Sequence, residues 1–188
     1  LFTLAQAFSA QPLPQGPNLA IVTNSGGPGI MTADACEKSS LHIARISHDI
    51  VKQLQEFLPS YASLYNPIDI IGDADAQRYA RTLRIIVQDP NVDSILVLLS
   101  PTSSIADKIE DTAQAIIDAL QGCQKPVFAC FMGKMAIAKG QKMLQEAGIP
   151  CYNFPEPAIQ SLEAMHNYSL WKQRPAVPRE KIERNLAK

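Results

Sequence analysis

A glycine-rich loop after the first apolar run of this 188-residue sequence carries the strongest signal for chemistry. It reads Asn24-Ser25-Gly26-Gly27-Pro28-Gly29 and joins the apolar residues 19–23 to a segment with helical spacing. Glycines leave backbone N–H groups uncovered, and the first N–H groups of a helix lack partners at its positive end. The loop therefore predicts a turn that binds a phosphate or a carboxylate, with the Asn24 amide and the Ser25 hydroxyl as further donors. The alternative is a tight turn that only packs helix on strand, since the loop matches neither GxGxxG nor GxxxxGK[ST].

Two later loops carry polar groups that fit either a site or a turn. In Asn66-Pro67-Ile68-Asp69, the side chains of Asn66 and Asp69 either cap the turn or contact a ligand. Thr102 and Ser103 either cap the helix that follows or contact the same ligand. Lys134 fits a solvated turn lysine.

Histidines and cysteines indicate neither a catalytic centre nor a metal centre in this chain. His42, His48 and His166 are expected away from the loops named above, so we predict no catalytic histidine and no metal site. The cysteines lack a CxxC pair or a histidine at ligand spacing, and we interpret them as small buried thiols in a reducing cytosol. They are Cys36, Cys123, Cys130 and Cys151.

The elements that must position these loops alternate between strand and helix. Strands are expected at 19–23, 41–46, 94–99, 127–131 and 149–154, and amphipathic helices lie between them, most regularly over 74–88. Residues 94–99 show no alternation, as in a strand buried on both faces. The pattern predicts an α/β, flavodoxin-like, three-layer doubly wound sheet of five parallel strands in the order 2-1-3-4-5. The loops 24–29 and 100–104 would meet at the carboxyl edge of that sheet, at its switch point, and 66–69 and 133–134 are candidate neighbours of that site.

Composition sets the class of the protein and its surroundings. Apolar residues make up 46% and charged residues 19%, with a net charge of −1, so the chain is globular and gives no electrostatic case for nucleic acid or an anionic membrane. No apolar run approaches the length of a membrane span, and we expect a soluble, cytoplasmic protein. We divide the chain into a leading helix with a Pro-rich hinge (1–17), the flavodoxin-like domain (18–171) and a linker or arm (172–188).

Several motifs in register give the chain a family resemblance. They are 20–24 with 26–31, 33–37, 66–74, 89–93, 125–127, 131–133, and 148–152 with 155–156. In these the sequence resembles the ADP-forming acetyl-CoA (acyl-CoA) synthetases of the succinyl-CoA synthetase superfamily. The resemblance implies the reversible conversion of acyl-CoA, ADP and phosphate to acid, CoA and ATP through a phosphohistidine, and it identifies the chain with the second flavodoxin-like, ligase-CoA type domain.

The same resemblance implies partners and cofactors outside this chain. The phosphohistidine loop, the CoA-binding domain and the ATP-grasp signature are missing, so these parts are expected on other domains or subunits, in a dimer or larger assembly. No cofactor is expected on this domain alone, while the parent enzyme would use CoA, ADP/ATP and Mg. Phosphate and a small carboxylic acid are the expected ligands.

For the site residues, the resemblance implies that the glycine turn opens one of two helices facing each other across the phosphohistidine. Asn24, Ser25, Gly26, Gly27 and Gly29 would hold phosphate, and Asn66 and Asp69 would shape the adjoining wall. The segment 101–105 and Lys134 depart from the family pattern, which leaves the acyl substrate open. Two alternatives remain: an acyl-CoA-sensing region of a protein lysine acetyltransferase, and a flavodoxin-like module that binds another small ligand.

Overall fold

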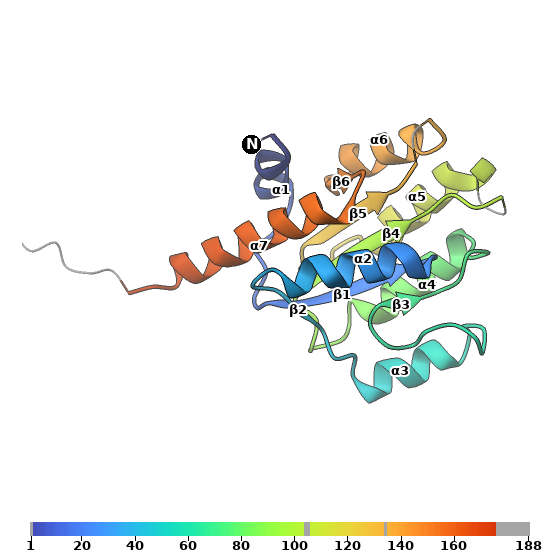
Figure 1. Cartoon of the computed structure of the whole chain (residues 1–188), viewed down its shortest axis with the longest axis horizontal. Coiled ribbons are helices and arrows are strands. Elements are labelled where there is room, and N and C mark those ends of the chain that lie inside the picture. Colours follow the sequence, from blue (N-terminus) through green and yellow to red (C-terminus); the bar gives the residue numbers. More distant parts are fainter. Residues whose placement is uncertain (1, 104–105, 134, 176–188) are drawn as a thin grey trace, which may run out of the picture.

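The computed structural model describes residues 2–103, 106–133 and 135–175, which form a parallel sheet between two helical layers (Figure 1). The strands are β1 (Asn18–Thr23), β2 (His42–Ile43), β3 (Ile68–Asp69), β4 (Ser94–Leu99), β5 (Val127–Phe131) and β6 (Cys151–Tyr152). Their order is β2-β1-β4-β5-β6, all in parallel pairs, and β3 pairs with β1 as well. The predicted order of the five strands is confirmed, and β3 is a sixth strand that we had not predicted.

The helices divide between the two faces of the sheet. They are α1 (Phe2–Ala10), α2 (Gly26–Glu37), α3 (His48–Gln55), α4 (Ala76–Ile86), the 3₁₀ turn η1 (Ala106–Lys108), α5 (Ile109–Ala119), α6 (Ala138–Glu146) and α7 (Pro155–Lys172). Helices α3 to α6 pack against one another on one face, and α7 packs on α2 and α1 on the other. The predicted amphipathic helix over 74–88 corresponds to α4.

The central strand β4 shows why its sequence lacks alternation. Ile95, Val97 and Leu99 lie in the core under α3 to α6, whereas Leu96 and Leu98 lie in the core under α2 and α7. Each of these five side chains is fully buried. A strand covered on both faces must be apolar at every position, as the sequence predicted.

Strands β2 and β3 share one edge of the sheet. β2 pairs with Asn18 and Leu19 at the start of β1, and β3 pairs with Val22 and Thr23 at its end. The strand predicted over 41–46 is therefore shorter than expected, because the chain leaves the sheet after Ala44. Two-residue strands carry no period of their own, which is why β3 escaped prediction.

The leading helix packs on the body of the domain. Ala7 is fully buried, and the Phe8 ring meets the Tyr168 ring of α7 edge-on at 5.5 Å. The Gln11 side chain donates to the Gly148 carbonyl at 2.6 Å and accepts from the Val127 N–H at 2.7 Å. The hinge at 11–17 is thus tied to the sheet, while the boundaries 18–171 stay a prediction. The arm predicted over 172–188 lies outside the described residues from 176 onward.

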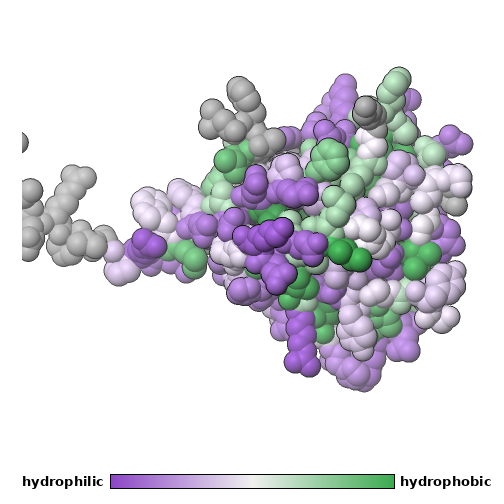
Figure 2. Space-filling model, viewed as in Figure 1, coloured by the Kyte–Doolittle hydropathy of each residue, from purple (hydrophilic) through white to green (hydrophobic). Residues whose placement is uncertain are grey.

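Hydrophilic residues cover much of the face that carries α2 and α7, with hydrophobic residues in small patches between them (Figure 2). In the described ranges, no helix is both long and apolar enough for a bilayer span.

One buried histidine lies on α7. His166 is 6% exposed, and its Nδ1 finds no hydrogen-bond partner among the described residues. Burial lowers the pKa of His166 below its ordinary value of 6.5, and His42 adds to this, while the Asp93 and Glu163 carboxylates act in the opposite direction. The folded domain therefore favours the neutral imidazole.

This shift predicts a pH dependence of stability. Below about pH 6.5 the unfolded chain binds a proton at His166 before the folded chain does, so the free energy of unfolding falls as the pH falls. We expect His166→Gln to reduce that slope in urea unfolding between about pH 5 and 7.5. The exposed His48, changed to Gln, is the control and should leave the slope in place. An unchanged slope in His166→Gln would contradict the assignment.

Candidate functional site

Three loops meet at the carboxyl edge of the sheet, following β1, β3 and β4. The Thr102 hydroxyl donates to the Gly72 carbonyl at 2.6 Å, which joins the loop after β4 to the loop after β3. A Cβ on Gly72 would lie 3.7 Å from the Asn24 carbonyl oxygen, so the loop after β1 adjoins both. The strand order thus brings the glycine turn, Asp69 and Thr102 to one edge of the sheet. Asn66 is not brought there, because it precedes β3 and lies beside the middle of β1.

Asn24 extends the pairing of β1 with β4 beyond the strands themselves. Its Nδ2 donates to the Ser100 carbonyl and its Oδ1 accepts from the Ser100 N–H, both at 2.9 Å. The residue is 1% exposed. The Asn24 side-chain amide thus pairs with the Ser100 main chain as a backbone peptide group of a neighbouring strand would, and it holds the two loops together. It does not face solvent as a free donor.

Asn66 performs a similar task on the other side of β1. Its Nδ2 donates to the Leu19 carbonyl at 2.7 Å and the Ala44 carbonyl at 3.1 Å, and its Oδ1 accepts from the Ile21 N–H at 2.9 Å. The side chain fills the gap between the end of β2 and the start of β3. These contacts match the structural interpretation of the Asn66 turn, and its role toward a ligand stays a prediction.

The glycine turn divides into an open part and a packed part. Gly26 and Gly27 are exposed and form the first helical positions of α2, whereas Gly29 is buried. A Cβ on Gly29 would lie 3.3 Å from Thr23 Cγ2 and 3.4 Å from Pro67 Cβ, and the Gly29 N–H already donates to the Ser25 carbonyl at 3.3 Å. Gly29 therefore allows α2 to approach the strands, whereas Gly26 and Gly27 are the exposed glycines at the start of the helix.

Ser25 is the N-cap of α2, with an extended backbone (φ −153°, ψ 127°). Its hydroxyl makes no capping bond to the helix. Its main chain is held by Thr23, whose hydroxyl accepts from the Ser25 N–H at 3.0 Å and donates to the Ser25 carbonyl at 2.8 Å. The first turn of α2 contains no acidic residue of its own, so nothing within the helix neutralises its positive end.

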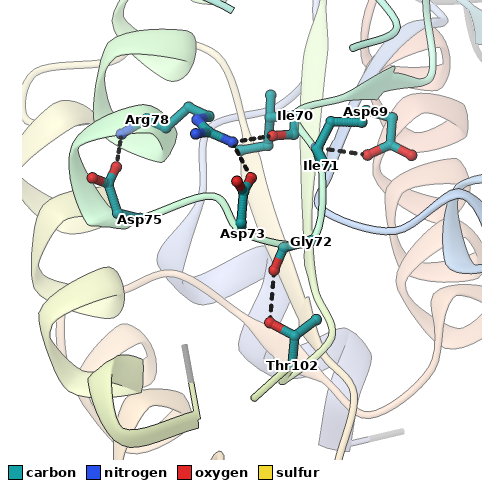
Figure 3. A network of polar contacts seen from close by, with 8 residues as sticks. All are labelled: Asp69, Ile70, Ile71, Gly72, Asp73, Asp75, Arg78 and Thr102. Atoms are coloured by element: carbon teal, nitrogen blue, oxygen red, sulfur yellow. Dashed lines mark hydrogen bonds and ion pairs between the residues drawn. The ribbon is translucent and has the colours of Figure 1, made fainter. Parts of the chain in front are cut away.

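A polar network fixes the loop after β3 (Figure 3). Arg78 of α4 donates from Nη1 to the Ile70 carbonyl at 3.0 Å and pairs with Asp73, while the Asp75 carboxylate caps α4 at the Arg78 N–H. Asp69 Oδ1 accepts from the Ile71 N–H at 2.9 Å. Ile71 has φ 72°, a left-handed backbone that a β-branched residue adopts only at a cost in strain. The network therefore holds Asp69 in a fixed position beside the turn.

Sequence reasoning missed Arg78, Thr23 and Ile71. The spacing of Asp75 before the first residue of α4 was a usable N-cap signal, and it would have placed Arg78 in the first turn beside the loop. Nothing in the sequence distinguishes Thr23 from an ordinary strand residue. Ile71 could not be foreseen because β-branched residues rarely adopt the left-handed backbone that it has here.

The remaining predicted residues lie at the same edge. Thr102 uses its hydroxyl to hold Gly72, and Ser103 is exposed at the end of that loop. Residues 104, 105 and 134, part of the departures from the family pattern, lie outside the described residues. The three histidines lie elsewhere: His42 pairs with Asn18 at the opposite end of β1, His48 begins α3, and His166 is on α7.

A parallel sheet in this strand order, with helices on both faces, defines a doubly wound, flavodoxin-like α/β domain. The particular family follows from comparison: a model of the Ligase-CoA domain matches residues 19–172. The chain belongs to this family, and the resemblance inferred from the motifs is confirmed.

Relatives of known name agree with this assignment. The chain is 38% identical over 152 residues to acetate–CoA ligase (ADP-forming) I of Archaeoglobus fulgidus, covering 81% of this chain and 21% of that protein. It is 36% identical over 167 residues to the alpha subunit of acetate–CoA ligase (ADP-forming) II of Pyrococcus furiosus, covering 88% of this chain and 36% of the subunit. The chain thus spans well under half the length of these two relatives.

Solved structures share the fold. The chain superposes on PH0766 from Pyrococcus horikoshii OT3 with a TM-score of 0.86 at 35% identity, covering 90% of this chain and 39% of that one. Acetyl-coenzyme A synthetase 1 of Ca. Korarchaeum cryptofilum, in complex with phosphate and ADP, gives a TM-score of 0.82 at 27% identity, with coverage of 93% and 39%. The chain is therefore a domain of the ADP-forming acyl-CoA synthetase family.

The geometry predicts the effect of Asn66→Asp. A carboxylate keeps the acceptor for the Ile21 N–H but places its second oxygen against the Leu19 and Ala44 carbonyls. Losing a buried donor and placing charge against two acceptors should lower the free energy of unfolding by about 3 kcal/mol, measured by urea unfolding.

Asn153→Asp is the matched control, because exposed Asn153 only accepts there, from Gln141 Nε2 at 2.9 Å. That variant should be close to neutral. If Asn66→Asp instead kept full stability and lost only ligand binding, the ligand role would be favoured over the structural one.

Proposed function

We propose that this domain binds phosphate at the N-terminus of α2 during the reversible conversion of acyl-CoA, ADP and phosphate to acid, CoA and ATP. The observation that carries the proposal is the open first turn of α2, where two exposed glycines present N–H groups and the helix has no acidic residue of its own in that turn. A transferring phosphoryl group spreads charge over its oxygens, and preorganised backbone donors stabilise that charge without reorganising.

The chemistry of covalent transfer belongs to other parts of the parent enzyme. We place the phosphohistidine, the CoA site and the ATP-grasp site on other domains or subunits, because this chain spans only part of its relatives. Asp69 lies beside the turn, and Thr102 is hydrogen-bonded to Gly72. Together with Ser103, these residues would line the space left for the acyl substrate. The domain would thus supply one half of a phosphate clamp.

The affinity of the domain alone should be weak. Two charge-assisted hydrogen bonds and the helix dipole supply a few kcal/mol before the cost of immobilising the anion, which corresponds to a Kd of about 1 mM or weaker. Phosphate at millimolar concentration and constant ionic strength is therefore the appropriate probe.

Titration with inorganic phosphate should shift the amide resonances of Gly26 and Gly27 in a ¹H–¹⁵N spectrum. Gly122 and Gly148 precede β5 and β6, at the opposite edge of the sheet, and serve as internal controls that should not move. A titration in which the Gly26 and Gly27 resonances move no more than these controls would refute the proposed site.

The division of labour predicts that the 188-residue chain, purified alone, forms no ATP from acetyl-CoA, ADP and phosphate. A coupled ATP assay checks this, with a full-length ADP-forming acetate–CoA ligase as the positive control. Turnover by the isolated chain would show that the missing chemistry is present in it after all.

A further inference from the structure

We propose that Asp69 makes the α2 turn selective for oxyanions that retain a proton, so that phosphate binds and sulfate does not. This inference rests on the proposed phosphate site and adds the residue that sets its specificity. The selectivity would arise because the Asp69 carboxylate lies beside a helix N-terminus that would otherwise attract any anion.

The position of Asp69 is set by the sheet. Asp69 ends β3 and pairs with Thr23, the last residue of β1, so it stands next to the start of the glycine turn. Its Oδ1 accepts from the Ile71 N–H at 2.9 Å. Its Oδ2 lies 3.6 Å from the point that a Cβ on Gly26 would occupy. One carboxylate oxygen is thus committed to the loop, and the other adjoins the first residue of α2.

The described residues provide no cation to neutralise this second oxygen. Arg78 is engaged with Ile70 and Asp73 on the opposite side of the loop, as Figure 3 shows. No hydrogen bond or ion pair to Oδ2 is found in the described ranges. An anion at the Gly26 and Gly27 N–H groups would therefore lie close to a carboxylate.

The protonation of the anion decides whether that proximity is repulsive. Phosphate near neutral pH keeps at least one proton, so one of its oxygens donates to Oδ2 while others accept from the N–H groups. Sulfate has lost both protons and offers Asp69 only lone pairs. Arsenate matches phosphate in size and protonation and should behave like it. Asp69 thus converts a general anion site into one that requires a donor on the ligand.

The alternative is that Asp69 itself serves as the anion for α2. In that case no external ion binds while the carboxylate is present, and removal of its charge opens the site to any anion. This alternative predicts a different result for the unmodified chain, which makes the two ideas separable.

The test compares inorganic phosphate, arsenate and sulfate on the 188-residue chain and on Asp69→Asn, followed by the Gly26 and Gly27 amide resonances at constant ionic strength. Asparagine keeps the acceptor for the Ile71 N–H, so the loop should hold. Asp34→Asn, an exposed change on the same helix with the same change in charge, is the control.

We expect the unmodified chain and Asp34→Asn to bind phosphate and arsenate about ten-fold or more tightly than sulfate. Asp69→Asn should bind all three with similar affinity, mainly through a gain toward sulfate.

Equal binding of all three ions by the unmodified chain would overturn the inference and leave the phosphate site intact. Binding by Asp69→Asn alone would favour Asp69 as the built-in anion and overturn both. Binding by neither would refute the proposed function itself. The comparison of arsenate with sulfate on the unmodified chain needs no variant, so the inference stays testable if Asp69→Asn is unstable.

Discussion

The amide of Asn66 bridges a break in the sheet on which the candidate site depends. β2 ends beside Leu19 and β3 begins beside Val22. The Ala44 N–H still reaches the Leu19 carbonyl, but the Ile21 N–H between the two strands would lack a partner on this side without Asn66. Asn66 supplies a donor to Leu19 and an acceptor to Ile21 at that point. Because unpaired buried backbone groups are costly, this side chain substitutes for a strand and holds β3 in register with the end of β1.

The same logic governs the other side of β1, where Asn24 pairs with both polar groups of Ser100. Two buried amides thus fix the strand end from which the turn departs, and Thr102 adds a third tie through Gly72. The polar side chains of these loops, Asn24, Asn66 and Thr102, therefore mainly form hydrogen bonds that stabilise the loops themselves. The groups left for a ligand are then the backbone donors of the first turn of α2, the Ser25 hydroxyl and the second oxygen of Asp69.

The sequence was sufficient for the layers, the strand order and the edge at which the loops meet. A doubly buried run such as 94–99 and an amphipathic run such as 76–86 are local signals that packing reinforces. β3 was not predictable, because its two residues pair through contacts with β1 more than forty residues away. Nor does sequence separate Gly29 from Gly26 and Gly27, since the difference lies in which side of α2 meets Thr23 and Pro67.

The contrast between backbone and side-chain donors bears on how such a domain evolves. A phosphate held by the Gly26 and Gly27 N–H groups depends on the path of the main chain, which the two asparagines and the Arg78 network maintain. Side chains at the rim, such as Ser103, are exposed. Substitutions there can alter contacts to an acyl group at little cost in stability. We therefore expect the main-chain path of the glycine turn to stay constant, while the segment after β4, where this sequence departs from the family pattern, varies with the proposed acyl substrate.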